Sequence, residues 1–425
     1  MISRLKDIET LRPLVAELLE FSLRPSEAKK KRLWADHQAL KPVESPPVCV
    51  YYDGIPDQQW NLMLDSFQCK TPAGRFMEFD LQKRIWMAKN VPDDNIVWPS
   101  IAVNAVAKKK ADWGVKVKWH RTAEDDGLGA RKAESPFKEG IEVGRLQFSD
   151  QEIDAEATAL LAEEFRELCL DKLAVFVKYP TLGASPFDLA VELRGAEELL
   201  FDCVDAPEKV KELMEYLTSA FEAHHKAREQ KGHLNFFSPD GKYGQFGWRV
   251  HSYYPGASYI PGKPRLRDEW FYVSAQTSSG LGPEMYAEFV HPYNCRLAKL
   301  MTNKTVYYHG CETLDQKLDI LATLPNLRRQ HVSPWSSVKT AVEKFKGSVV
   351  LEIHSHPGKV FFGFSKEDMK TEIKGLVEQA EGVPFDLNLS DIHTVNGNPK
   401  LLAIWTEAAK EVLSKSKNIL LKRKV

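Results

Sequence analysis

The stretch TVYYHGCE, residues 305–312, joins a short run of β-branched and aromatic residues to a group of polar residues interrupted by a glycine. β-branched and aromatic side chains favour strands, and a glycine allows the backbone to turn. The stretch therefore predicts a short buried strand from Thr305 to His309, and a turn that presents the side chains after it.

Similar short runs recur along the chain, each followed by turn residues and a helical pattern. The eight predicted strands are Trp98 to Asn104, Leu173 to Tyr179, Gln245 to His251, Trp270 to Gln276, Thr305 to His309, Arg328 to Ser333, Val349 to His354 and Phe385 to Asp391.

Amphipathic helices are predicted between these strands. In residues 207–228 the apolar positions recur every three or four residues, as in a helix that covers a sheet. The neighbouring His224 and His225 on this helix are predicted to lie at the surface.

Strands that alternate with helices pair in parallel, because each crossover helix returns the chain to the same end of the sheet. Eight such units predict an α/β fold, a (β/α)₈ TIM barrel, with its chemistry at the carboxyl ends of the strands. Residues 1–95 are predicted to form an N-terminal helical and irregular extension. Residues 96–425 would form the barrel catalytic domain, with a β insertion near 113–148.

Composition narrows the function classes. The 425-residue chain carries 58 Lys and Arg against 59 Asp and Glu, so no overall field attracts nucleic acid. No long uncharged apolar stretch predicts a membrane span, and no apolar leader segment follows Met1. The six cysteines show no CxxC spacing, which predicts free thiols in a reducing compartment. We therefore expect a cytoplasmic protein.

His309 and Cys311 stand two positions apart, so on an extended chain both side chains face the same way. An imidazole and a thiolate are ligands that Zn²⁺ takes in proteins. The alternative is that both residues only pack or hydrogen-bond at the mouth of the barrel.

The strand from Val349 runs into Glu352, His354 and His356, polar positions that alternate along one face. Ionisable groups are rare in a core, so we expect them to border a wet cavity. The alternative is a hydrogen-bonded network without chemistry. On the final strand we expect Leu387, Leu389, Asp391 and His393 on one side, with the leucines deep and the polar pair near the rim. Asp391, His393 or Glu352 could therefore supply a third zinc ligand.

Other strand ends offer substrate contacts. Gln276 can donate and accept hydrogen bonds, and Tyr253 and Tyr254 provide flat walls with hydroxyl tips. His331 and Trp335 lie at and just after another strand end, where Trp335 caps the barrel mouth or stacks on a ligand. For Gln276, Tyr253 and Tyr254, simple loop packing is an equal alternative to ligand contact.

Five motifs in this order resemble the uroporphyrinogen decarboxylase superfamily, from about Leu173 to Trp405. They are PFDLA at 186–190, RGAEEL at 194–199, EFVHPY at 288–293, YHGCE at 308–312 and NLSD at 388–391. The superfamily also includes corrinoid-dependent methyltransferases. The chain lacks the arginine-bearing N-terminal motif of the decarboxylase, so porphyrinogen decarboxylation is not expected.

The methyltransferase branch holds zinc with a His-x-Cys pair and a cysteine on the last strand. His309 and Cys311 match the pair, but Asp391 stands where the last cysteine is found, with His393 two residues later. The resemblance therefore implies Zn²⁺ on His309, Cys311 and a third group, for which we take His393. An oxygen or nitrogen ligand in place of the last thiolate would change how strongly the zinc polarises what it binds.

The resemblance implies transfer of a methyl group from a methoxylated or methylated small molecule to the Co(I) centre of a separate corrinoid protein. His354, Glu352 or His251 would deliver a proton. The substrate would be bound by Gln276, Asp391 and the aromatic walls Tyr253, Tyr254 and Trp335. Two alternatives stand beside this hypothesis: a metal-assisted decarboxylase or lyase, and a noncatalytic barrel that binds a tetrapyrrole or corrinoid. A homodimer is compatible with each.

Overall fold

The computed structural model describes residues 2–121, 131–235 and 265–416. Its main feature is a parallel sheet of six strands in the order β1-β12-β11-β10-β9-β8. The strands are β1 (Val48–Val50), β8 (Phe271–Ser274), β9 (Val306–His309), β10 (Leu327–Val332), β11 (Val350–His354) and β12 (Phe385–Leu389).

A second parallel pair, β2 (Ser100–Asn104) and β7 (Ala174–Lys178), forms a ladder of its own. Strands are thus present at seven of the eight predicted places, and the predicted strand 245–251 lies outside the described residues. The α/β class and parallel pairing are confirmed. No ladder among the described strands joins the two sheets, so the closed barrel stays a prediction.

β1 is a strand that the sequence did not predict. It lies in the segment expected to be an N-terminal extension, yet Val48–Val50 pair in register with Leu387–Leu389 of the last strand. A first strand beside the last is the arrangement that barrel closure requires. The boundary at residue 95 stays a prediction, although β1 ties the preceding segment to the sheet.

Two antiparallel pairs accompany the segment between β2 and β7. β4 (Lys118–Arg121) pairs with β5 (Arg131–Glu134) inside the predicted insertion, and β3 (Ala107–Lys109) pairs with β6 (Glu152–Ile153).

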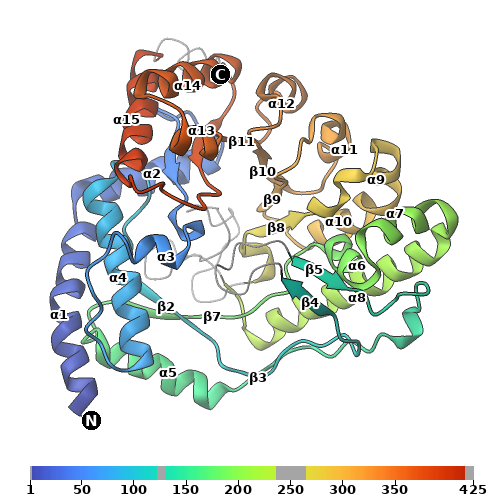
Figure 1. Ribbon diagram of the computed structural model, residues 1–425, viewed down its shortest axis with the longest axis horizontal. Coiled ribbons are helices and arrows are strands. Elements are labelled where there is room, and N and C mark those ends of the chain that lie inside the picture. The colour runs from blue at the N-terminus through green and yellow to red at the C-terminus, as the bar shows by residue number, and fades with distance from the viewer. Residues whose placement is uncertain (1, 122–130, 236–264, 417–425) are drawn as a thin grey trace.

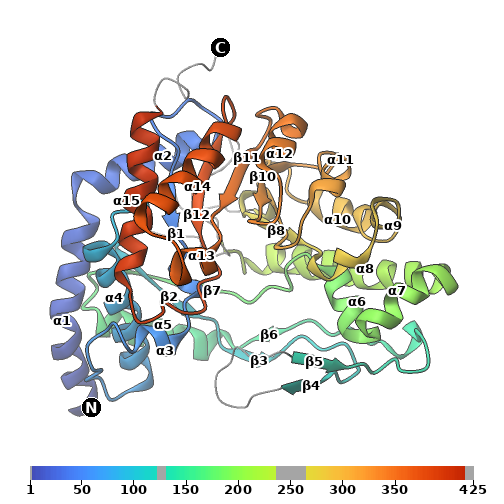
Figure 2. The same cartoon turned by 45° about the horizontal axis from the view of Figure 1, so that its top comes forward.

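Helices cover the outer faces of the strands (Figures 1 and 2). They are α1 (Ile2–Ser22), α2 (Pro25–Gln38), α3 (Asp57–Trp60), α4 (Pro72–Asn90), α5 (Ala155–Leu168), α6 (Pro186–Arg194), α7 (Ala196–Asp205), α8 (Pro207–Lys231), α9 (Pro283–Phe289), α10 (His291–Ala298), α11 (Leu318–Leu321), α12 (Val338–Phe345), α13 (Pro357–Phe362), α14 (Lys366–Gln379) and α15 (Lys400–Lys415).

Two hydrophobic cores hold these layers. The larger core joins the six-stranded sheet to its helices, with Leu351, Ile353 and Leu387 on the outward face of the sheet. The smaller core joins α1, α4 and α5 to the outward face of β2 and β7. Among the described helices, none combines the length and the apolar character that a membrane span needs.

α8 confirms the predicted apolar stripe, whose members Val210, Leu213, Met214, Leu217 and Phe221 are all buried. The helix ends at Gly232, whose φ of 71° suits a glycine that terminates a helix.

The surface position predicted for His224 and His225 is wrong, because both side chains are 1% exposed. The ring of His225 donates to the Gly183 carbonyl at 2.7 Å and accepts from Arg228 at 3.4 Å. His225 is buried, although its side chain is polar, because it lies on the face of α8 that carries the apolar stripe.

This burial predicts a pH dependence of stability. Burial, and then the charges of Arg228 and His224, lower the pKa of His225 from 6.5 to about 3. Between these values the unfolded chain binds a proton that the folded chain does not, so stability falls as the pH falls from 6.5 towards 3. We expect His225 to lower the free energy of unfolding by up to about 1.4 kcal/mol for each pH unit in this range. Urea unfolding at pH 7, 6 and 5 measures this loss, which should be absent from His225→Gln. The prediction would be contradicted if the free energy of unfolding changed with pH equally in the parent protein and in His225→Gln.

Candidate functional site

Polar side chains line the inward face of four neighbouring strands. Because alternate residues of a strand share a face, each strand contributes a pair. The pairs are Tyr307 and His309 on β9, Arg329 and His331 on β10, Glu352 and His354 on β11, and Asp386 and Asn388 on β12. All eight residues are buried.

The first layer of this face is an ion cluster around Arg329, which is 1% exposed. Its guanidinium donates to Asp386 at 2.8 and 2.9 Å and to Glu352 at 2.6 Å. Burial raises the pKa of both carboxyls. Arg329 outweighs this effect, with help from the imidazole beside each carboxyl, and holds both pKa values below their usual range.

Helix α2 reaches the same cluster from the N-terminal segment. His37 is 1% exposed, and its Nε2 lies 2.8 Å from Asp386 Oδ2. The Asn388 amide donates to the other Asp386 oxygen at 2.6 Å. Asp386 is thus held from three sides.

The second layer, one step nearer the carboxyl ends of the strands, is a row of three imidazoles. The ring centroids of His309 and His331 are 4.3 Å apart, and those of His331 and His354 are 4.2 Å apart. The hydroxyl oxygen of Tyr307 connects this row to the ion cluster. It is 2.9 Å from His309 Nδ1 and donates to Glu352 at 2.7 Å.

At one end of the row, His309 and Cys311 come together as predicted. His309 Nε2 lies 3.2 Å from Cys311 Sγ. A tetrahedral zinc ion would hold the two atoms about 3.6 Å apart, so a small adjustment would accommodate the ion. The donor chemistry of this pair, which we call the imidazole–thiol pair, fits Zn²⁺.

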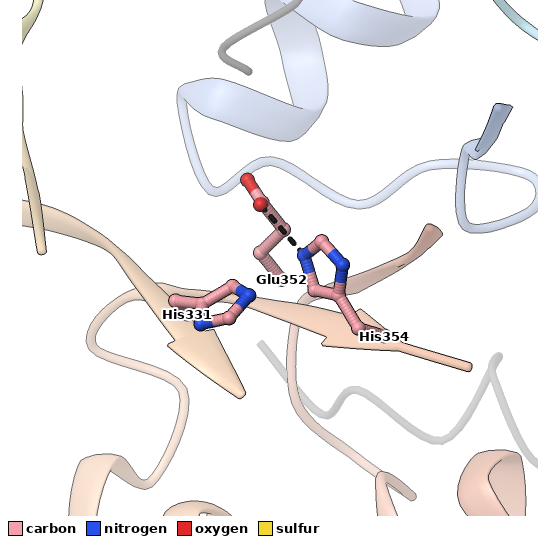
Figure 3. Close-up of side chains that lie close together, drawn as sticks. All are labelled: His331, Glu352 and His354. Carbon is pink, nitrogen blue, oxygen red and sulfur yellow. Dashed lines mark hydrogen bonds and ion pairs between the residues drawn. The ribbon is translucent and has the colours of Figure 1, made fainter. Parts of the chain in front are cut away.

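At the other end, His331, Glu352 and His354 gather between β10 and β11 (Figure 3). Their ligand atoms all lie within 4.8 Å of one another. We call this group the triad. His354 Nε2 is 2.8 Å from Glu352 Oε1, and two imidazoles with a carboxylate are also a donor set that metals use.

The remaining predicted residues have different surroundings. Gln276 lies half-buried in the turn after β8, and Asp391 is half-buried just after β12 with a φ of 55°. His393 is exposed and is not a member of the one three-donor group that the described residues form. Trp335 is 64% exposed and meets the ring of His356 edge-on at 4.7 Å. His251, Tyr253 and Tyr254 lie outside the described residues.

Arg329, Asp386 and His37 are not among the site residues predicted from the sequence, and His331 is not among the predicted metal ligands. A signal existed for two of them, since Arg329 and His331 stand two positions apart on a predicted strand, as Glu352 and His354 do. On the last strand the predicted inward face, with Leu387, Leu389 and Asp391, is one residue out of phase. Leu387 belongs to the outward core, and Asp386 and Asn388 face the site.

The cysteines agree with the expectation of free thiols. All six lie in the described part of the chain, and none forms a disulfide.

Comparisons with known proteins identify a fold neighbour. No family description and no curated protein sequence matches the chain. Among solved structures it is similar to a methyltransferase from Methanosarcina mazei, with a TM-score of 0.51 and 11% sequence identity. The match covers 90% of this chain and 98% of the other. At that identity the likeness shows a shared fold.

Proposed function

We propose that this chain is a zinc-dependent methyltransferase that moves a methyl group from a small methoxylated or methylated molecule to a separate corrinoid protein. The observation that carries the proposal is the imidazole–thiol pair, whose His309 and Cys311 atoms lie 3.2 Å apart at the carboxyl end of a parallel strand. The fold neighbour from Methanosarcina mazei is a methyltransferase, which supports the proposal.

In this proposal His309 and Cys311 hold the ion. Zinc would act as a Lewis acid on the leaving oxygen or nitrogen of the methyl donor, which is a poor leaving group when free. Tyr307 orients the His309 ring through Nδ1, which leaves Nε2 directed at Cys311. His393 is exposed, so its role as third ligand rests on the resemblance alone.

The same face offers a proton donor. His354 is hydrogen-bonded to Glu352 through Nε2, and Glu352 is in turn bonded to Tyr307 and Arg329. Such a chain can hold a proton at His354 and release it to a leaving group. His251 is a second proposed donor. Gln276, Asp391, Tyr253, Tyr254 and Trp335 would bind the substrate.

The test is a mixing experiment. The purified protein is combined with a reduced corrinoid protein and a panel of methoxyaromatics and methylamines, and the cobalt absorption spectrum is followed. Conversion of the Co(I) spectrum to that of methylcobalt with one donor class is the expected result. Consumption of a carboxylate substrate with release of CO₂ and an unchanged cobalt spectrum would favour the decarboxylase alternative instead.

A further inference from the structure

The triad has the outer contacts of a preorganised metal site. His331 Nδ1 donates to the Gly310 carbonyl, which makes Nε2 the unprotonated nitrogen of that ring. His354 Nδ1 lies 2.8 Å from Ser390 Oγ, and Glu352 Oε2 accepts from Arg329 at 2.6 Å. In metal sites, partners of this kind fix the orientation of each ligand.

The triad and the imidazole–thiol pair direct their donors to different points. His309 Nε2 faces Cys311, and its Nδ1 faces Tyr307. The ring of His331 lies beside that of His309. Its ligand atom, however, lies close to those of Glu352 and His354. The two donor sets are therefore neighbours that share no residue.

We propose that His331, Glu352 and His354 form a divalent-cation site of their own, next to the imidazole–thiol pair. Two imidazoles and one carboxylate, with no sulfur, suit Zn²⁺, Fe²⁺, Mn²⁺ or Co²⁺. The ion replaces the hydrogen bond between His354 Nε2 and Glu352 Oε1, and the Nε2 proton moves to Nδ1 of the same ring, where it faces Ser390 Oγ. While the ion is bound His354 is a ligand, so it can donate a proton only when this site is empty. Donors around such an ion stand about 3.0 to 3.4 Å apart, so this 2.8 Å contact opens by a few tenths of an ångström.

Cobalt titration tests the site without any assay of activity. Metal-free protein carrying Cys311→Ser, which disables the imidazole–thiol pair, is titrated with Co²⁺ alone while its visible absorption is recorded. We expect one Co²⁺ per chain, with visible bands and no intense near-ultraviolet absorption from a sulfur ligand. Adding Glu352→Gln should weaken binding at least about 100-fold, and adding Ser390→Ala about 10-fold.

Glu312→Gln in the Cys311→Ser background is the matched control, because Glu312 is a half-buried carboxylate outside the triad. It should bind cobalt with undiminished affinity. Circular dichroism checks that each variant is folded. The proposal is overturned if Cys311→Ser binds no cobalt, or if adding Glu352→Gln leaves the affinity unchanged. Neither result depends on methyl transfer, so the function proposed above can fail while this site stands, and the reverse.

Discussion

Replacement of Arg329 by methionine should destabilise the protein by about 3 to 5 kcal/mol in urea unfolding. The guanidinium is 1% exposed and carries hydrogen bonds to both Asp386 and Glu352. Without it, two buried carboxylates face each other with no cation between them, and such uncompensated charge is costly. Arg329→Lys should recover only part of the loss, because an ammonium lacks the planar fork that spans both carboxylates.

The matched control is Arg145→Met. Arg145 also pairs with a carboxylate, Glu142 at 2.9 Å, but both side chains are about half exposed. Water already screens that pair, so little change in stability is expected. A similar small change for Arg329→Met would show that the buried ion cluster does not stabilise the fold.

His309→Ala and Cys311→Ala should each lower methyl transfer at least about 100-fold and remove bound zinc, while the protein stays folded. Both residues lie at the carboxyl end of β9, where side chains contribute little to the packing of the strands. Zinc content, circular dichroism and the rate of change of the cobalt spectrum measure the three expectations.

Helix α10 supplies a control of the same chemistry. His291 Nε2 and Cys295 Sγ are 3.1 Å apart there, so they form a second imidazole–thiol contact away from the strand ends. Cys295→Ala should keep both zinc and activity. Normal turnover in either His309→Ala or Cys311→Ala would contradict the assignment of this pair as zinc ligands.

The repeated pattern of strands and helices could be predicted from the sequence because each element carries its own signal. β7 and β8 consist largely of β-branched and aromatic residues, and α8 follows its apolar stripe from Val210 to Phe221. β1 begins a run of the same kind, VCVYY at 48–52, but the run follows two prolines in a segment expected to be irregular. Three residues, Val48–Val50, are too few to show a period, and they form a strand only because β12 lies beside them.

The site could be predicted in part for a similar reason. The convergence of His309 and Cys311 follows from their spacing on one strand. The triad joins two strands, and the contact of His37 with Asp386 joins residues 349 positions apart. Contacts of that kind depend on register and packing, which one sequence does not state. On β12 the alternation of side chains does not say which face points inward. Leu387 and Leu389 are predicted to face the site, but they face the outer core.

Metal dependence of methyl transfer tests the account most directly. The protein is assayed with the corrinoid partner and its methyl donor before and after removal of metal by a chelator, and again after Zn²⁺ is restored. The account predicts that the rate of Co(I) consumption collapses without metal and returns with zinc. An unchanged rate in protein shown to be free of metal would contradict it.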